Sequence, residues 1–177
     1  MIRFENVTEK AFPSIYEKMK AAFPLEERRK YIDQLECLKD ERFNFFEITE
    51  NNSAVGFIAI WNLDGFVFLE HLAIDEDKRS GGYGSKAVEL LKATYNKPVI
   101  LEAEAPVTEQ QVKRIAFYDR LGFKVNDFDY EQPSYHGGEG VPLKILSFPN
   151  LLTAKEFNNF IKETRSSAYK KKETNEK

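Results

Sequence analysis

The segment that most limits the folds open to this chain is a cluster of glycines at the start of a helix. Residues 66–74 have the apolar and aromatic content of a strand, and a charged elbow follows them. Residues 79–84 then read Arg-Ser-Gly-Gly-Tyr-Gly and lead directly into a helical pattern. Glycines leave the first N–H groups of a helix uncovered, and these donors together with the helix dipole attract phosphate oxygens. We therefore expect a phosphorylated cofactor to bind here.

The helix after the glycines is predicted by the spacing of its apolar residues. One face carries Ala87, Leu90, Leu91 and Thr94, which follow the helical period. Pro98 forces the helix to stop, because proline cannot continue it.

Length and charge exclude several classes of protein. The chain has 177 residues, 42% of them hydrophobic, which suits one domain with a two-layer core. A net charge of -3 and a pI near 5.6 argue against a general nucleic-acid binder, which would need a basic face. Residues 1–5 lack a signal-peptide core, and no segment approaches the ~20 apolar residues of a membrane span. We expect neither nucleic acid nor a membrane among the partners.

The cysteine and histidine content points to a reducing compartment and to chemistry without a metal. The single cysteine, Cys37, excludes an internal disulfide, and its apolar neighbours predict a buried thiol. We therefore expect a cytoplasmic protein. The two histidines are not clustered, so we expect no metal site.

The first half of the chain reads as a strand, two helices and an antiparallel meander. Thr8 is the expected cap of the first helix, and Pro24 ends it. Asp64-Gly65 is a hairpin signal, because both residues tolerate the positive φ of a tight turn. The other predicted elements are strands at 2–7, 43–49, 54–62 and 66–74 and a second helix at about 26–40.

The second half continues the alternation of helices and strands. The predicted elements after the glycine-led helix are a strand at 98–104, a helix at 108–121 and strands at 122–130 and 141–148. The whole order is strand, helix, helix, three strands, helix, strand, helix and two strands, which is an α/β fold. A polar, glycine-containing loop at 132–138 is suited to recognition.

The chain is expected to end in a helix and a polar tail. Thr153 to Glu156 form a capping box that starts the helix. We divide the chain into a domain at 1–150, a C-terminal helix at 151–165 and a disordered polar tail at 166–177.

Two other glycine motifs fit the cluster less well. Residues 82–87 match G-x-G-x-x-A, and Glu102 ends a strand 20 residues after Gly82, as in a dinucleotide-binding unit. However, residues 75–81 make the elbow too long, and the antiparallel meander is foreign to that fold. A phosphate-binding P-loop would need a Gly-Lys-Ser/Thr sequence at the required spacing, which is missing.

A second motif sharpens the assignment. Residues 114–123 read Arg-Ile-Ala-Phe-Tyr-Asp-Arg-Leu-Gly-Phe, a helix end that passes through glycine into a strand. Together with the glycine cluster, this motif resembles the GNAT acetyltransferase superfamily. The family signature Q/R-x-x-G-x-G/A is matched from Arg79 to Gly84, and F-Y-x-x-x-G-F from Phe117 to Phe123. The element order is similar over about residues 2–149. The resemblance implies a GNAT fold, with a mixed central sheet of about seven strands flanked by helices, and acetyl-CoA as co-substrate.

The resemblance also places the cofactor. Acetyl-CoA would lie where strand 66–74 separates from strand 98–104, with its diphosphate on the N–H groups of residues 80–85 and its pantetheine arm beside residues 72–74. Gly81 stands where many members carry a basic residue, so that contact is missing or comes from Lys78 or Lys86. Gln111 and Arg114 stand where many members carry Asn and Ala. The residues expected at the cofactor are Leu72, Ala73, Ile74, Arg79, Ser80, Gly81, Gly82, Tyr83, Gly84, Ser85, Arg114 and Phe117.

Acetyl transfer to an amine requires a base, an oxyanion site and an acid. An alkyl amine with a pKa near ~10.4 is protonated at neutral pH, so a base assists the reaction. Glu70 shares a strand face with Phe68, Leu72 and Ile74 if strict alternation holds, and burial there would raise its pKa. By the same alternation, His71 would face away from it. The oxyanion would be held by backbone N–H groups near residues 72–74.

Glu102 and Tyr118 complete the catalytic candidates. Glu102 resembles the strand glutamate that serves as base in some family members, and the family commonly uses the tyrosine at the position of Tyr118 as general acid. A phenol with a pKa near ~10 stays protonated at neutral pH. The alternatives are a solvated or hydrogen-bonded carboxylate for either glutamate and core packing for the tyrosine.

The acceptor is less constrained by sequence. Residues 23–28 resemble the family segment that walls the acceptor site, so Glu26, Tyr135 and His136 are the expected acceptor contacts. The predicted activity is transfer of an acetyl group to a primary amine of a small molecule or peptide, by a monomer or homodimer. The alternatives are a non-catalytic acyl-CoA-binding sensor or scaffold and a dinucleotide-binding domain.

Overall fold

The computed structural model describes residues 1–171 of the 177-residue chain. Its longer strands are β1 (Ile2–Asn6), β2 (Phe43–Glu50), β3 (Ser53–Leu63), β4 (Phe66–Ile74), β5 (Val99–Ala103), β6 (Lys124–Asn126) and β9 (Lys144–Phe148). Two short strands are β7 (Glu131–Gln132) and β8 (Val141–Pro142). The α-helices are α1 (Phe12–Ala22), α2 (Tyr31–Cys37), α3 (Tyr83–Tyr95), α4 (Glu109–Arg120) and α5 (Ala154–Arg165).

The longer strands form one mixed sheet. Within the described residues, this sheet has seven strands in the order β1-β2-β3-β4-β5-β9-β6, and β7 and β8 form a separate pair. Strands β4 and β5 run parallel, whereas the other neighbouring pairs in the large sheet are antiparallel. The predicted α/β fold with about seven strands is therefore confirmed, and a dinucleotide-binding fold, which needs a mostly parallel sheet, is excluded.

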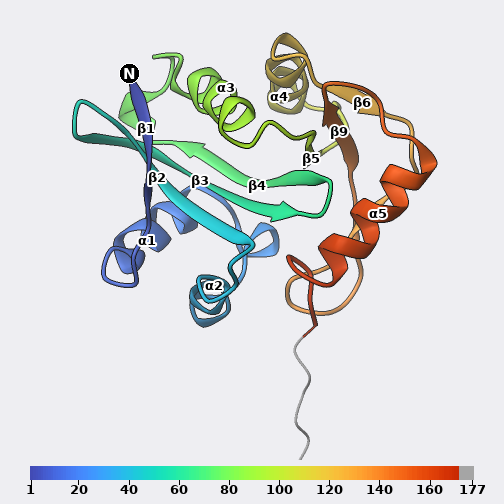
Figure 1. Ribbon diagram of the computed structural model, residues 1–177, viewed down its shortest axis with the longest axis horizontal. Helices are drawn as coiled ribbons and strands as arrows, with labels where there is room; N and C mark the ends of the chain where they lie inside the picture. The colour runs from blue at the N-terminus through green and yellow to red at the C-terminus, as the bar shows by residue number, and fades with distance from the viewer. Residues whose placement is uncertain (172–177) are drawn as a thin grey trace, which may run out of the picture.

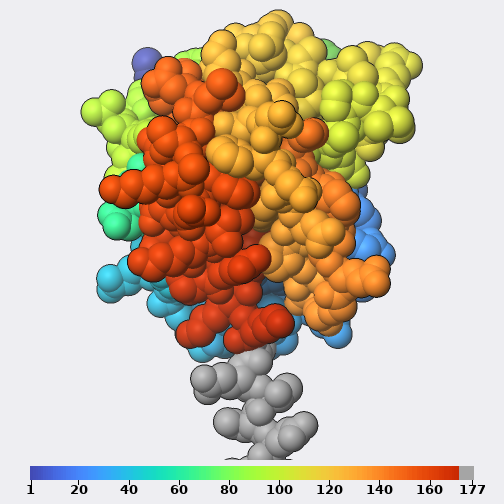
Figure 2. Space-filling view, turned by 90° about the vertical axis from the view of Figure 1, so that its right-hand side faces the viewer, coloured from blue at the N-terminus to red at the C-terminus, as the bar shows by residue number. Residues whose placement is uncertain are grey.

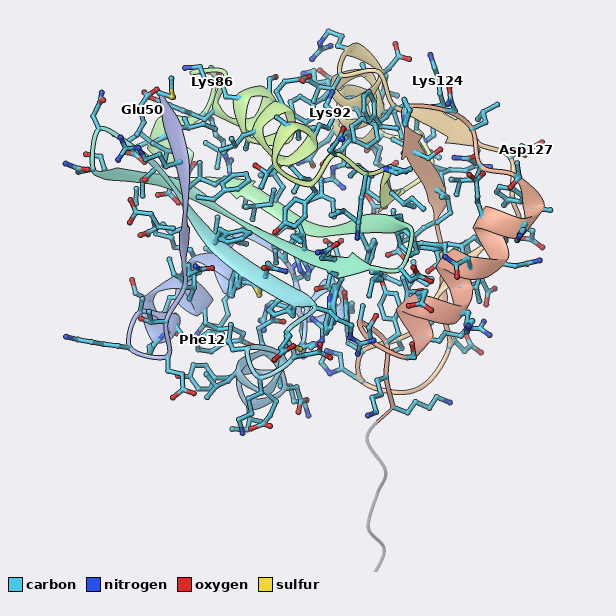
Figure 3. The ribbon with its side chains drawn as sticks, viewed as in Figure 1. Phe12, Glu50, Lys86, Lys92, Lys124 and Asp127 are labelled. Carbon is cyan, nitrogen blue, oxygen red and sulfur yellow. The ribbon has the colours of Figure 1, made fainter. Side chains whose placement is uncertain are left out.

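Helices cover both faces of the sheet (Figure 1). On one face, α1, α2 and α5 bury a cluster rich in aromatic residues that includes Phe12, Phe57 and Phe160. On the other face, α3 and α4 cover aliphatic residues such as Ile58 and Leu91. Figure 3 shows Phe12 on the α1 side of the sheet, opposite the side on which Lys86 of α3 is drawn. The two cores account for the position of the sheet as a central layer.

Local sequence signals determine several element ends. The α4 and α5 capping boxes are formed, with Thr108 paired to Gln111 and Thr153 to Glu156. Gly65 has a φ of +83° in the hairpin between β3 and β4, as the Asp-Gly signal predicts.

Some predicted boundaries are wrong. The helix expected at 26–40 is shorter, because a 3₁₀ turn at Leu25–Glu27 and an extended Arg28 precede α2. The strand expected at 122–130 is reduced to β6, and that at 141–148 is split into β8 and β9. Thr8 is not the cap of α1: its Oγ1 accepts a hydrogen bond from the N–H of Ala11, which itself precedes the helix.

The prediction of a disordered tail is wrong for residues 166–171. Ala168 and Tyr169 are 4% and 8% exposed, and they pack against the aromatic core. The N–H of Tyr169 donates to the carbonyl of Thr164 at 2.8 Å, so the chain turns back directly after α5. Residues 172–177 of the predicted tail lie outside the described residues. Among residues 1–171, no helix combines the length and the apolar character needed to cross a bilayer.

Candidate active site

The site lies where the two parallel strands separate. Strands β4 and β5 pair only from Val67 with Val99 to Leu69 with Leu101. Beyond these residues, a cavity of about 340 Å³ opens between the strands. It is lined by Phe23, Pro24, Glu26, Glu27, Leu69, Glu70, His71, Leu72, Leu101, Glu102, Ala103, Glu104, Arg114, Tyr118, Gln132, Val141 and Leu143. The predicted strand separation is confirmed, and the three predicted catalytic residues all line the same cavity.

A β-bulge in β4 changes the orientation of the residues around the cavity. Ala59 of β3 pairs with His71 and Ile60 pairs with Leu69, so Glu70 is an extra residue in β4. As a result, Leu72 packs in the aliphatic core although Phe68 belongs to the aromatic one.

The prediction that Glu70 shares a face with Leu72 and Ile74 is therefore wrong, because it assumed unbroken alternation. The bulge also brings His71 to the Glu70 side, with Nδ1 3.8 Å from the Glu70 carboxylate. The prediction that His71 faces away from Glu70 is wrong for the same reason.

Glu70 is held in a buried ion pair. Arg29 donates to both of its carboxylate oxygens, at 2.6 and 3.1 Å, and the two side chains are 7% and 1% exposed. Trp61 Nε1 and the Tyr135 hydroxyl donate to the same carboxylate at 3.1 and 2.9 Å. The two carboxylate oxygens of Glu70 thus accept four hydrogen bonds. These bonds hold the side chain in one position and keep it ionised.

The pKa of Glu70 follows from this pairing. Burial alone would raise the pKa, but the charge of Arg29 and its hydrogen bonds, with a contribution from His71, outweigh burial and lower the pKa below its ordinary value. The predicted rise in the pKa of Glu70 is therefore wrong, because sequence alone does not show the arginine from the α1–α2 segment.

Glu102 is the second buried carboxylate, and the side chains that donate hydrogen bonds to it are neutral. It accepts hydrogen bonds from the Tyr130 hydroxyl, from the Tyr169 hydroxyl at 2.6 Å and from Gln132 Nε2 at 2.8 Å. Desolvation raises the pKa of Glu102 to about 7 in spite of these donors, and the charge of Glu70 adds to the rise. A carboxylate with a pKa in this range is suited to proton transfer at neutral pH.

Tyr118 lies on α4 and faces the cavity from the aliphatic side of the sheet. Its ring packs edge-on against Phe117 and Phe123, at centroid distances of 4.9 and 5.4 Å. Burial raises the pKa of Tyr118 to about 12, although Arg114 acts in the opposite direction. The phenol is therefore protonated at neutral pH and can donate a proton into the cavity.

The glycine segment before α3 leaves an open backbone. Gly82 is the N-cap of α3 with a φ of +74°, and a Cβ built there would meet no described atom within 4 Å. Gly84 packs closely on α4, because its Cβ position is 3.3 Å from the Phe117 ring. Ser80 also has a positive φ, of 65°. This exposed turn with free space in front of it fits a diphosphate.

Side chains beside the glycine segment add a charged group. The Tyr83 hydroxyl donates to Glu50 at 2.9 Å, and Lys86 Nζ lies 3.7 Å from the same carboxylate. Figure 3 shows Glu50 and Lys86 at the same end of the molecule. Lys86 is 52% exposed near the start of α3, so it is one of the two lysines, with Lys78, that were expected as substitutes for a basic residue at position 81.

The end of β4 is shaped by a glycine on the neighbouring strand. Leu72, Ala73 and Ile74 lie beyond the last β4–β5 pair, so within residues 1–171 this edge of β4 has no strand partner. A Cβ on Gly56 of β3 would lie 2.2 Å from the Ala73 carbonyl oxygen, so only glycine allows this approach. The open edge could pair with an extended arm of a ligand.

The predicted acceptor contacts are only partly at the cavity. Glu26 lines the cavity. Tyr135 does not, and it instead lies behind Glu70 with its ring 4.8 Å from the Arg29 guanidinium. His136 Nε2 bonds the carbonyls of Leu25 and Arg28, at 2.8 and 3.0 Å, and thus joins the loop to the α1–α2 segment.

The mouth of the cavity is acidic. Glu26, Glu27 and Glu104 line it together with a single arginine, Arg114, which is 3.7 Å from Glu104. The pKa of Glu27 is raised by desolvation and by the nearby Glu104 charge. The carboxylates outnumber the arginine at this mouth, so a cation is favoured there.

Several site residues were not found by sequence reasoning. Arg29, Trp61, Tyr130, Gln132 and Tyr169 surround the two buried glutamates. None belongs to a family motif, and all of them except Trp61, which is nine residues from Glu70, are at least 28 residues from the glutamate they contact. Two of them carried a readable signal: Gln132 begins the 132–138 loop that is suited to recognition, and Tyr169 is an aromatic residue in a segment otherwise too polar to pack.

Comparison with known proteins agrees with this geometry. A family model described as the acetyltransferase (GNAT) family matches residues 11–123. The Bacillus subtilis (strain 168) protein YjbC, whose name assigns it to the acetyltransferases, is 32% identical over 154 residues, which cover 84% of this chain and 78% of YjbC.

Solved structures show the same fold. A Bacteroides thetaiotaomicron protein assigned by its name to the GNAT family has a TM-score of 0.86 at 31% identity, covering 96% of this chain and 99% of that one. An aminoglycoside 6'-N-acetyltransferase complexed with coenzyme A has a TM-score of 0.57 at 15% identity, covering 83% of this chain and 95% of that one.

Proposed function

The chain belongs to the acetyltransferase (GNAT) family, whose members use acetyl-CoA, and we propose that it transfers the acetyl group directly to a primary amine of a small molecule or peptide. The observation that carries this proposal is one cavity between β4 and β5 lined by both Glu102 and Tyr118. A group that accepts a proton near neutral pH and a group that donates one thus face the same space.

The glycine turn and the open edge of β4 are the proposed cofactor site. The backbone of residues 80–85 would hold the diphosphate, and the edge at Leu72–Ile74 would hold the pantetheine arm. When bound, acetyl-CoA supplies an activated thioester. Backbone N–H groups near Leu72 are the proposed donors to the charge that develops on its carbonyl oxygen.

Glu102 is the proposed general base. Glu102 lines the cavity, and a pKa of about 7 leaves a large fraction of its carboxyl groups deprotonated at neutral pH. It would take the proton that the acceptor ammonium must lose before the amine can attack, either directly or through one water. Glu70 is not proposed for this role, because its carboxylate is committed to Arg29.

Tyr118 is the proposed general acid. Its side chain lines the cavity from the face of the sheet opposite Glu102. Its pKa of about 12 means that the phenol is protonated at neutral pH. A thiolate leaving on that side would be protonated by this phenol.

The acidic mouth bears on the acceptor. Glu26, Glu27 and Glu104 favour an amine whose molecule carries positive charge, and they disfavour an acidic peptide. We therefore propose a cationic amine as the acceptor class.

A panel of amines tests the proposed function. Purified protein with acetyl-CoA is expected to release free thiol only when an amine is added, and cationic amines are expected to give the highest kcat/KM. A non-catalytic sensor or scaffold would bind acetyl-CoA in calorimetry but release no thiol with any amine. That result would overturn the proposal while leaving family membership intact.

A further inference from the structure

The C-terminal segment reaches the proposed base from behind the cavity. Tyr169 does not line the cavity, yet its hydroxyl donates to Glu102 Oε2 at 2.6 Å. Gln132 Nε2 donates both to the Tyr169 hydroxyl and to Glu102, each at 2.8 Å. Tyr169 is 8% exposed, so water does not replace this contact freely. The segment after α5 is thus hydrogen-bonded to Glu102, the proposed general base.

Two backbone contacts hold Tyr169 in place. Its own N–H donates to Thr164 at the end of α5, at 2.8 Å. The carbonyl of the preceding residue, Ala168, accepts a 2.6 Å hydrogen bond from Arg29, the partner of Glu70. Figure 2 shows α5 packed beside the segment that contains residues 124–143. The tyrosine is therefore fixed from α5 and from the α1–α2 segment.

We infer that Tyr169 is a positioning residue that stabilises the ionised form of Glu102 and so determines the pH at which the base becomes active. This inference rests on the proposed role of Glu102. A phenol donor stabilises a carboxylate but not the carboxylic acid, so the tyrosine opposes the effect of burial on Glu102. A segment outside the family motifs would thereby tune the reaction.

Other charged and titratable groups surround Glu102 from each packed element. Tyr130 donates to its other oxygen, and Glu70, neutralised by Arg29, lies on the neighbouring β4. The remaining groups are Tyr135 of the 133–140 loop, His71 of β4, Glu104 directly after β5, Arg114 and Tyr118 of α4, and Glu27 before α2. None of these groups is substituted in a Tyr169→Phe variant, which removes only the hydroxyl together with its hydrogen bonds to Glu102 and Gln132.

The test is a carbon-13 NMR titration of the Glu102 carboxyl in the full chain, with its signal assigned by its loss in Glu102→Gln. Tyr169→Phe is expected to raise the pKa of Glu102 by about 1 unit, because one charge-assisted donor is lost. Tyr95→Phe on α3 is the matched control and is expected to leave the titration unchanged. An unchanged pKa in Tyr169→Phe would overturn the inference, whether or not the protein transfers acetyl groups.

The activity profile gives a second readout. At pH 7, kcat/KM of Tyr169→Phe is expected to be about fivefold lower than that of the wild type. At pH 9, the two values are expected to agree within about twofold. An equal loss at both pH values would show a packing role only and would overturn the inference.

If a melting curve shows that Tyr169→Phe does not fold, a different variant provides the test. Replacing the tyrosine at 169 with 3-fluorotyrosine keeps the ring and makes the phenol a stronger donor. The pKa of Glu102 is then expected to fall, and a rise or no change would contradict the inference.

Discussion

Two glutamates on neighbouring strands differ because of the side chains behind them. Glu70 faces the bidentate guanidinium of Arg29, whereas Glu102 faces the neutral donors Tyr130, Gln132 and Tyr169. A full positive charge outweighs desolvation and keeps Glu70 anionic, but neutral donors offset desolvation only in part. One carboxylate is therefore structural and the other is titratable near neutral pH.

The pH dependence of the reaction should report Glu102. Because a base acts in its deprotonated form, kcat/KM is expected to rise with pH through an apparent pKa of about 7. Glu102→Gln is expected to lower kcat/KM by ~10²-fold at pH 8 and to remove this limb. Glu104→Gln, one residue beyond the end of β5, is the control and should retain the limb. A Glu102→Gln enzyme with the same limb as the wild type would exclude Glu102 as the base.

Tyr118→Phe separates catalysis from binding at the second candidate. Removing the hydroxyl deletes the proton donor but keeps the ring that packs on Phe117 and Phe123. We expect acetyl-CoA affinity to be unchanged in calorimetry and kcat to fall by ~10²-fold or more. Unchanged turnover would leave Tyr118 with its packing role alone.

At the scale of elements, a bulge and a glycine turn build the site from β4 and α3. The bulge at Glu70 lets one strand place a buried anion on one face and, two residues later, Leu72 on the other. After β4, the turn at Gly82 leads into α3 and leaves the backbone of the first residues of this helix exposed. The bulge and the turn are both irregular backbone segments, and the regular pairing of β4 with β3 and the helix α3 hold them in place.

Gly82→Val tests the glycine turn as a cofactor site. The new side chain would fill open space before α3 and would strain a φ of +74°, so we expect weaker acetyl-CoA binding with the fold retained. Gly65→Val is matched for strain, with a φ of +83°, but lies in the β3–β4 hairpin. Calorimetry should show a lower affinity only in the first variant. Equal affinities would argue that the diphosphate binds elsewhere.

At the scale of the whole molecule, Arg29 connects distant parts of the chain. It contacts Gln34 of α2, Glu70 of β4 and Ala168 of the C-terminal segment. The guanidinium lies between β4 and the helical layer of α2 and α5, where it stabilises the packing and also supports the site.

Arg29→Met is expected to destabilise the protein by about 3 kcal/mol or more, because it leaves the buried carboxylate of Glu70 without its counter-charge. Arg42→Met, which removes the partly exposed pair with Asp40, should cost less than about 1 kcal/mol. Urea denaturation measures both free energies of unfolding. If both variants lost a similar free energy of unfolding, the buried Arg29–Glu70 pair would contribute no more to stability than the partly exposed Arg42–Asp40 pair.

Much of the fold was predictable because its signals are local. The glycine turn, the Asp-Gly hairpin, the α5 capping box and the periodicity of α3 each depend on residues within one or two turns of chain. The short strands β6 to β8 were predicted poorly, because their pairing partners rather than their own residues determine where they end.

The sequence by itself determined most of the order of elements, the family motifs and the three catalytic candidates Glu70, Glu102 and Tyr118, which all line the cavity. Only the tertiary structure decided which of these residues are paired and which can titrate. Arg29 and Tyr169 lie 41 and 67 residues from the glutamates they contact, so their effects depend on long-range packing. The protonation of a buried carboxylate is a property of its neighbours in space, and no pattern along the chain encodes those neighbours.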